Sequence, residues 1–177
     1  MHYLDHLGGD AGGTGLFASM FKAPYITKWK DFTDAGEAIE YAKGISLGPG
    51  GDYPEAVHDA VIDACTKLNW VDLPGTPMLR YIFHIADAPP HGTEFGNTGQ
   101  PQKGCKCGLT TEQMFHEINM KQIHYRLIKV RPNHQLKIME DTFRKGCVNF
   151  DCADISHAKE MDVRVSDMII HEVLPQG

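Results

Sequence analysis

The chain has 177 residues, of which 42% are hydrophobic and 23% are charged, and this is the ordinary composition of one globular domain with a hydrophobic core. The formal net charge is −6 and the 17 lysines and arginines are scattered, which argues against a nucleic-acid-binding surface. No apolar run approaches the roughly 20 residues needed to cross a bilayer, so we expect one soluble domain over residues 1–177 that binds no membrane.

The first predicted feature is a glycine-rich loop over residues 8–24, which does not match a dinucleotide-binding fingerprint because no helix follows it. Aromatic and β-branched residues predict an extended segment over 25–32. Thr33 and Asp34 can then cap a short helix. After a glycine-rich break, apolar residues at three-and-four spacing predict a helix over 56–68.

The second half of the chain alternates strand and helix patterns. An apolar run predicts a central parallel strand over 79–86, and Asp87 follows it directly. Further along, the patterns predict a loop over 92–108, a capped helix over 110–121, a strand over 123–130, a helix over 134–145, a strand over 148–152 and a helix over 165–173. This alternation predicts a doubly wound α/β fold with a mainly parallel sheet and helices on both faces.

Ligands of such sheets bind at the carboxyl ends of the strands, which makes Asp87 a candidate site residue. His84 lies inside the predicted strand, and we expect it to be buried and hydrogen-bonded rather than a ligand. His91 stands beside a glycine in the loop that follows, and we expect it to be solvated.

The five cysteines are an odd number, and the chain opens without the pattern of a secretion signal, so we expect a reducing, cytoplasmic setting. Cys105 and Cys107, with His91 nearby, could bind zinc, but a second cysteine pair at the spacing typical of zinc sites is missing. We therefore interpret this segment as a loop that carries two free thiols.

Several distinctive segments occur in the order in which a known family carries them. They are residues 3–6, 32–34, 50–57, 85–92, 105–109 and 165–167. The most specific are Gly-Gly-Asp-Tyr-Pro-Glu-Ala-Val at 50–57 and Ala-Asp-Ala-Pro-Pro-His-Gly at 86–92. Over nearly its whole length, the chain resembles the von Willebrand factor A domain that accompanies alpha-type protein kinases.

The resemblance implies a metal-ion-dependent adhesion site, which the family builds from an Asp-x-Ser/Thr-x-Ser motif, a Thr or Asp before a later helix, and an Asp after the fourth strand. Asp52 matches the second position and Asp87 matches the third. The first motif has no counterpart, so the domain is expected to be incomplete at its N-terminus. Two carboxylates would bind Mg²⁺ or Mn²⁺ only weakly. The kinase module of the family is absent from these residues.

Both aspartates also have purely structural explanations. Asp52 to Glu55 has the pattern of a capping box, with Pro54 in the first helical turn, where its missing N–H does no harm. Asp87 stands before two prolines, and aspartate favours such turns because it binds nearby backbone N–H groups.

The resemblance favours a non-catalytic interaction domain that binds a protein partner through a divalent cation. An alternative is a small α/β hydrolase-like enzyme that uses a carboxylate, or Cys107 with His91, although the usual hydrolase, P-loop and kinase motifs are missing. A third interpretation is a truncated product with no competent site. A sheet without its central strand would expose unpaired backbone groups, so we also expect self-association or a partner that supplies a strand.

Overall fold

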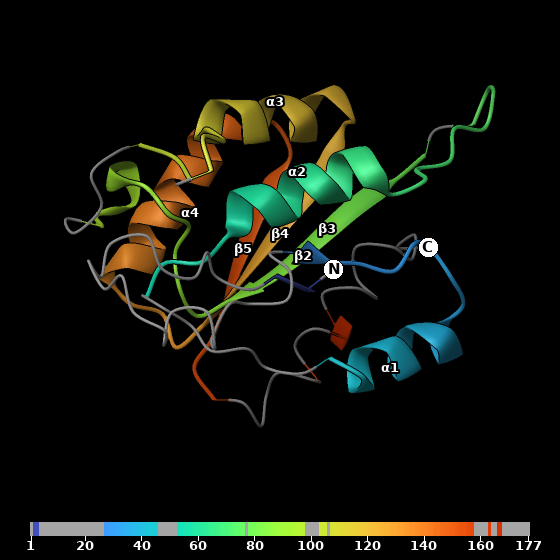
Figure 1. Cartoon of the computed structure of the whole chain (residues 1–177), viewed down its shortest axis with the longest axis horizontal. Coiled ribbons are helices and arrows are strands. Elements are labelled where there is room, and N and C mark those ends of the chain that lie inside the picture. Colours follow the sequence, from blue (N-terminus) through green and yellow to red (C-terminus); the bar gives the residue numbers. More distant parts are fainter. Residues whose placement is uncertain are drawn as a thin grey trace, which may run out of the picture.

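The structure is a computed structural model that describes residues 2–3, 27–45, 53–76, 78–97, 103–105, 107–157, 163 and 166–167 (Figure 1). Its elements in chain order are β1 (His2–Tyr3), β2 (Thr27–Lys28), α1 (Ala35–Lys43), α2 (Val57–Lys67), β3 (Arg80–Ala86), a 3₁₀ helix (Thr93–Phe95), α3 (Thr111–Met120), β4 (Ile123–Val130), α4 (His134–Gly146) and β5 (Phe150–Ile155).

The main sheet of the described residues has the order β3-β4-β5, and both strand pairs are parallel. Ala86 pairs with Lys129, and Lys129 pairs with Asp154, so the carboxyl ends of all three strands lie side by side. A separate antiparallel pair joins β1 and β2. The prediction of an α/β fold with a parallel sheet is confirmed, but β3 was predicted to be a central strand and lies at an edge of the described sheet.

Three helices form the hydrophobic core together with the sheet. In Figure 1, α2, α3 and α4 lie together on one side of the strands, and α1 lies apart from them. The core contains fully buried side chains from each layer, including Val57 of α2, Met114 of α3, Phe143 of α4 and Tyr125 and Leu127 of β4. In contrast, α1 buries none of its residues. The three packed helices therefore hold the sheet in place.

Most of the predicted elements agree with the structure. The strand expected over 123–130 is β4, and the helices expected over 56–68, 110–121 and 134–145 are α2, α3 and α4 within one or two residues at each end. The last strand was predicted two to three residues too early, since β5 runs from Phe150 to Ile155. The glycine-rich loop 8–24 lies outside the described residues, as does most of the helix expected over 165–173.

The capping box predicted at the start of α2 is wrong. This helix begins at Val57, and its N-cap Ala56 has no side-chain hydrogen bond, so Pro54 does not lie in the first turn. The reason is that the backbone of Glu55 pairs with another segment: its N–H donates to the Pro89 oxygen at 2.9 Å, in a parallel bridge to Pro90. Extended backbone at Glu55 delays the helix. Asp52 itself lies outside the described residues.

The capping box expected at the start of α3 is confirmed. The Gln113 N–H donates to the Thr110 hydroxyl at 3.2 Å, and the Thr110 N–H donates to the Gln113 side-chain oxygen at 2.8 Å. These reciprocal bonds satisfy two backbone donors that a helix start otherwise leaves without partners. The beginning of α3, and with it the end of the preceding loop, is thereby fixed.

His84 is buried and hydrogen-bonded, as its place in the strand predicted. Its Nδ1 lies 2.7 Å from the Tyr125 hydroxyl oxygen on the neighbouring strand. Burial lowers the pKa of His84 to about 4, because the interior disfavours the charged ring. The unfolded chain, with a pKa near 6.5, therefore binds a proton more readily than the folded chain does.

The lowered pKa of His84 predicts a loss of stability in mild acid. The loss begins as the pH falls through 6.5 and ends near pH 4, and from pH 8 to pH 5 it should be about 2 kcal/mol. We expect His84→Gln, which cannot titrate but can still share a hydrogen bond with Tyr125, to remove this part of the decline. Urea unfolding of both proteins at the two pH values measures it. Identical pH dependence in both proteins would contradict the prediction.

Candidate functional site

The carboxyl edge of the sheet carries one of the two predicted cation ligands. Asp87 directly follows β3 and is exposed. Among the described residues, no hydrogen bond or ion pair engages its carboxylate, so it does not stabilise a turn in the way the sequence had suggested as an alternative. The Asp87 side chain is available to solvent at the position where parallel sheets commonly bind ligands.

Tyr53 links the segment before α2 to the residue after β3. Its hydroxyl donates to the Asp87 backbone oxygen at 3.0 Å and accepts a hydrogen bond from the Asn133 side-chain amide at 2.7 Å. Asn133 is the N-cap of α4 and follows β4. Residues from three separate loops therefore meet beside Asp87. Asp52 lies outside the described residues, and its chain neighbour Tyr53 contacts Asp87 directly.

The loop after β3 is held against the segment before α2. The His91 N–H donates to the Glu55 oxygen at 3.2 Å, and the Asn97 side chain donates to the Pro90 and Gly92 oxygens at 2.8 and 3.1 Å. His91 is fully buried, so the expectation that it is solvated is wrong. The hydrogen bond from the His91 backbone holds this loop against the protein. The neighbouring glycine, from which solvent exposure was inferred, does not indicate such a bond.

The two thiols of the Cys105–Cys107 loop meet a carboxylate from α2. The Sγ atoms of Cys105 and Cys107 lie 3.2 and 3.5 Å from the Asp59 Oδ2 atom. All three potential ligand atoms lie within 4.8 Å of one another, and His91 is not part of this group. Neither cysteine forms a disulfide, but the sequence gave no indication that Asp59 lies beside them.

Both thiols are protonated in this arrangement at neutral pH. Burial raises the pKa of Cys105 well above its usual range, and burial also raises the pKa of Cys107. A nucleophilic cysteine needs the opposite shift, because the thiolate is the reactive form. The loop therefore lacks the electrostatics of an activated Cys107 nucleophile.

Glu94 fixes the base of this loop. Its carboxylate accepts hydrogen bonds from the Gly104 N–H at 2.9 Å and from the Thr111 hydroxyl at 2.6 Å. Gly104 has a φ of 72°, and a Cβ atom there would lie 2.5 Å from the Leu109 oxygen, so only glycine fits. Gly104, which directly precedes Cys105, is thus held by Glu94 of the 3₁₀ helix, and Glu94 also binds the start of α3.

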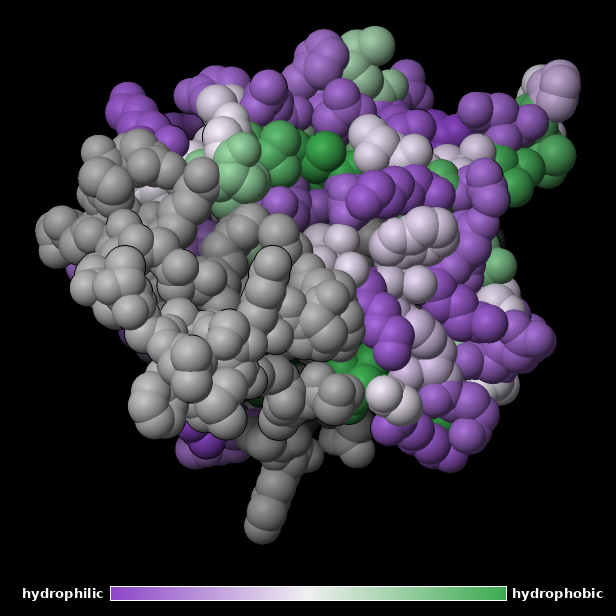
Figure 2. All heavy atoms as spheres, in the orientation of Figure 1, coloured by the Kyte–Doolittle hydropathy of each residue, from purple (hydrophilic) through white to green (hydrophobic). Residues whose placement is uncertain are grey.

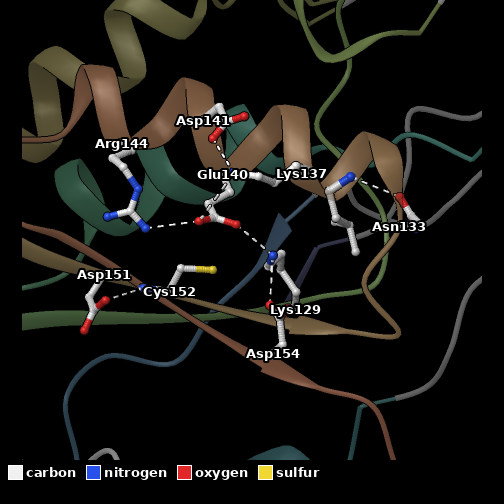
Figure 3. Close-up of polar contacts among 10 residues, drawn as sticks. Lys129, Asn133, Lys137, Glu140, Asp141, Arg144, Asp151, Cys152 and Asp154 are labelled. Carbon is white, nitrogen blue, oxygen red and sulfur yellow. Dashed lines mark hydrogen bonds and ion pairs between the residues drawn. The ribbon is translucent and has the colours of Figure 1, made fainter.

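A buried lysine lies at the carboxyl end of β4. Only 5% of the Lys129 side chain is exposed, and its Nζ lies 2.8 Å from the carboxylates of both Glu140 and Asp154 (Figure 3). Burial lowers the Lys129 pKa, but the bonds to Asp154 and Glu140 outweigh it and leave the pKa above its ordinary value. Arg144 also binds Glu140, at 3.1 Å. The network joins β4, α4 and β5.

The described surface is mostly polar on the side shown in Figure 2. Apolar residues appear on this face only in bands and small groups. The helices of the described residues are all too short or too polar to cross a lipid bilayer.

Comparison with known proteins adds no family assignment. A scan against protein-family models found no matching model, and a search of curated proteins found no match.

The Lys129 network allows a direct test of what holds the carboxyl edge together. Lys129→Ala leaves the partly buried Glu140 without its closest cation and should lower the free energy of unfolding by about 3 kcal/mol. Lys129→Met keeps the apolar stem and should cost about 1 kcal/mol less. Urea unfolding measures both.

The matched control for this test is Lys137→Ala. Lys137 is 57% exposed and also lies near Glu140, at 3.9 Å. Because exposed ion pairs contribute little, its loss should cost less than about 0.5 kcal/mol. Equal effects of the two alanine substitutions would show that burial of Lys129 carries no special weight.

Proposed function

We propose that this chain is a protein-interaction domain of the von Willebrand factor A kind, with a doubly wound sheet, which binds an acidic side chain of a partner through Mg²⁺ or Mn²⁺ at the carboxyl edge of the sheet. Asp87 and Asp52 are the protein's own ligands in this proposal. The observation that carries it is the exposed Asp87 carboxylate at the end of a parallel strand, with the segment after Asp52 hydrogen-bonded to its backbone.

The chemistry of the edge fits a weak cation site. Mg²⁺ prefers six oxygen ligands in near-octahedral geometry and usually retains several waters when one or two carboxylates bind it. Asp87 supplies one carboxylate oxygen, and Asp52 is proposed to supply the second. The nearby Tyr53 hydroxyl already donates one hydrogen bond and accepts another, so it is not needed as a ligand. Waters and the partner's carboxylate would complete the shell.

The position of the ligands also suits an adhesive role. Asp87 protrudes from a loop whose backbone is bonded to the α2 entry, so its carboxylate is presented from a rigid base. A rigid ligand loses little conformational entropy when a partner docks, which raises affinity. A cation that has free coordination positions facing solvent can accept a carboxylate from outside. These properties suit a bridging cation better than a closed structural one.

Calorimetric titration of the purified chain with Mg²⁺ and Mn²⁺ tests the proposal. We expect saturable binding with a Kd on the order of 1 mM, because two carboxylates make a weak site. Asp87→Ala should abolish this binding. Asp72→Ala should not, since it removes an exposed carboxylate from the opposite end of β3.

Two calorimetric results would contradict the proposed cation site. If a folded chain, verified by a cooperative thermal melt, shows no heat of cation binding, the carboxyl edge does not act as an adhesion site. Equal binding by the wild type and by Asp87→Ala would place any bound cation elsewhere.

Self-association is a second expected property, because β3 and β5 are the edge strands of the described three-stranded sheet and an edge strand can pair with another chain. We expect a dimer, or a mixture of monomer and dimer, at micromolar concentration. Size-exclusion chromatography with light scattering measures the mass directly. A monodisperse monomer of 19.7 kDa that melts cooperatively at high temperature would contradict this expectation.

A further inference from the structure

Asp59, Cys105 and Cys107 bring together three metal-binding side chains from two distant segments. Asp59 lies in the first turn of α2, and both cysteines lie in the loop that precedes α3. We propose that these three residues bind Zn²⁺ or a similar thiophilic divalent cation, with the fourth coordination position completed by water or by a ligand from another molecule.

The distances already approach those of a zinc complex. Tetrahedral Zn²⁺ with Zn–S bonds of about 2.3 Å and a Zn–O bond of about 2.0 to 2.2 Å requires S···O separations of about 3.5 Å. The Asp59 oxygen lies 3.2 and 3.5 Å from the two sulfur atoms. All three atoms lie within 4.8 Å of one another. Small rotations of the side chains would therefore bring the three atoms around one ion.

The chemistry of the ligands selects the class of cation. Thiolates are soft ligands that favour zinc and other thiophilic metals, whereas Mg²⁺ and Ca²⁺ favour oxygen. Two sulfur atoms and one oxygen atom are a mixed set that zinc accepts. This site therefore differs in its metal from the oxygen site proposed at Asp87, and the two sites share no residue.

The loop is prepared for metal binding by its backbone. The Gly108 N–H donates to the Cys105 oxygen at 3.0 Å, which closes a tight turn around Cys107. The Cys107 N–H points to the Cys105 Sγ at 3.5 Å, and such N–H contacts stabilise a metal-bound thiolate. The Cys105 N–H donates to the Leu109 oxygen at 2.8 Å. Both sulfur atoms are thus held by a turn whose shape does not depend on the metal.

A divalent cation would offset most of the charge of the three ligands. Two thiolates and one carboxylate around a divalent cation leave one excess negative charge. Asp59 lies in the first turn of α2, where the partial positive charge of the helix N-terminus stabilises an anion. Because burial raises the pKa of both thiols, the metal must displace both protons when it binds, so affinity should rise with pH.

The exposure of the cysteines indicates how the metal would be reached. Cys105 is buried, but Cys107 is exposed, so the cluster opens to solvent on one side. Of the described residues, these three alone form a group of potential ligands close enough for one ion. An exchangeable fourth ligand on the open side is the arrangement typical of zinc sites that bind an outside group.

The test uses the full chain, reduced with a phosphine and freed of metal with a chelator. Titration with Zn²⁺ against a chromogenic chelator should give one tightly bound ion per chain. Titration with Co²⁺ should produce the near-ultraviolet charge-transfer band of thiolate ligation and the visible bands of a four-coordinate ion. Cys107→Ser should weaken Zn²⁺ binding by about 100-fold or more and remove most of the charge-transfer band.

Two matched variants separate the cluster from the rest of the chain. Cys152→Ser removes a half-buried thiol on β5 and should bind Zn²⁺ like the wild type. Asp59→Asn should weaken binding at least about tenfold, whereas Asp63→Asn, one turn later on α2, should not. Thermal melts of the metal-free variants verify folding.

The proposal is overturned if the reduced, folded chain binds no Zn²⁺, or if Cys107→Ser and Cys152→Ser bind it equally. Zinc binding without a thiolate band in the cobalt spectrum would likewise overturn it, because the ion would then be held by other residues, such as histidines. These outcomes are independent of the result of the Mg²⁺ titration.

Discussion

Parallel strands cannot be joined by tight turns, because each strand must start again at the edge of the sheet where the previous one started. The chain meets this requirement between β3 and β4 with α3, and between β4 and β5 with α4. Each helix therefore begins near the carboxyl edge, where the strands end. Loops that carry Asp87, the Cys105–Cys107 pair and Asn133 are gathered at this edge by topology alone. Both proposed cation sites depend on this constraint.

Polar contacts then determine how the gathered loops are arranged. Glu55 pairs with Pro89 and Pro90, which joins the entry of α2 to the exit of β3. Lys129 joins β4 to α4 and β5 through two carboxylates. Since a buried charge without partners would be costly, the lysine is tolerated only because both acids are close. Ligands keep a fixed geometry only if the edge that carries them is rigid. The backbone pairing of Glu55 and the ion pairs of Lys129 supply this rigidity.

The sequence predicted the α/β class, the parallel sheet and most element bounds because those depend on local patterns. The apolar strand 123–130 and the capping box at Thr110 are examples. It failed where a distant segment competes for the backbone, as at Glu55, and where burial depends on tertiary packing, as at His91. Lys129 left a detectable signal, since a lysine inside an apolar strand must find partners. Asp59 left none, because 46 residues separate it from Cys105.

Two chemically different ligand sets on one edge have a physical consequence for function. An exposed carboxylate surrounded by water binds a hard cation loosely and lets a partner's acid replace a water, which suits reversible association. A pair of thiols with a carboxylate in a fixed turn would bind a soft cation tightly, and the bound ion would join the start of α2 to the loop before α3. That loop leads into α3, and the start of α2 is bonded to the loop that carries Asp87. A metal held at the thiol site would therefore stiffen the loops that carry Asp87. Metal binding at the thiol site would then favour cation binding at Asp87, because less loop entropy is lost in the second step and no direct contact between the two sites is needed.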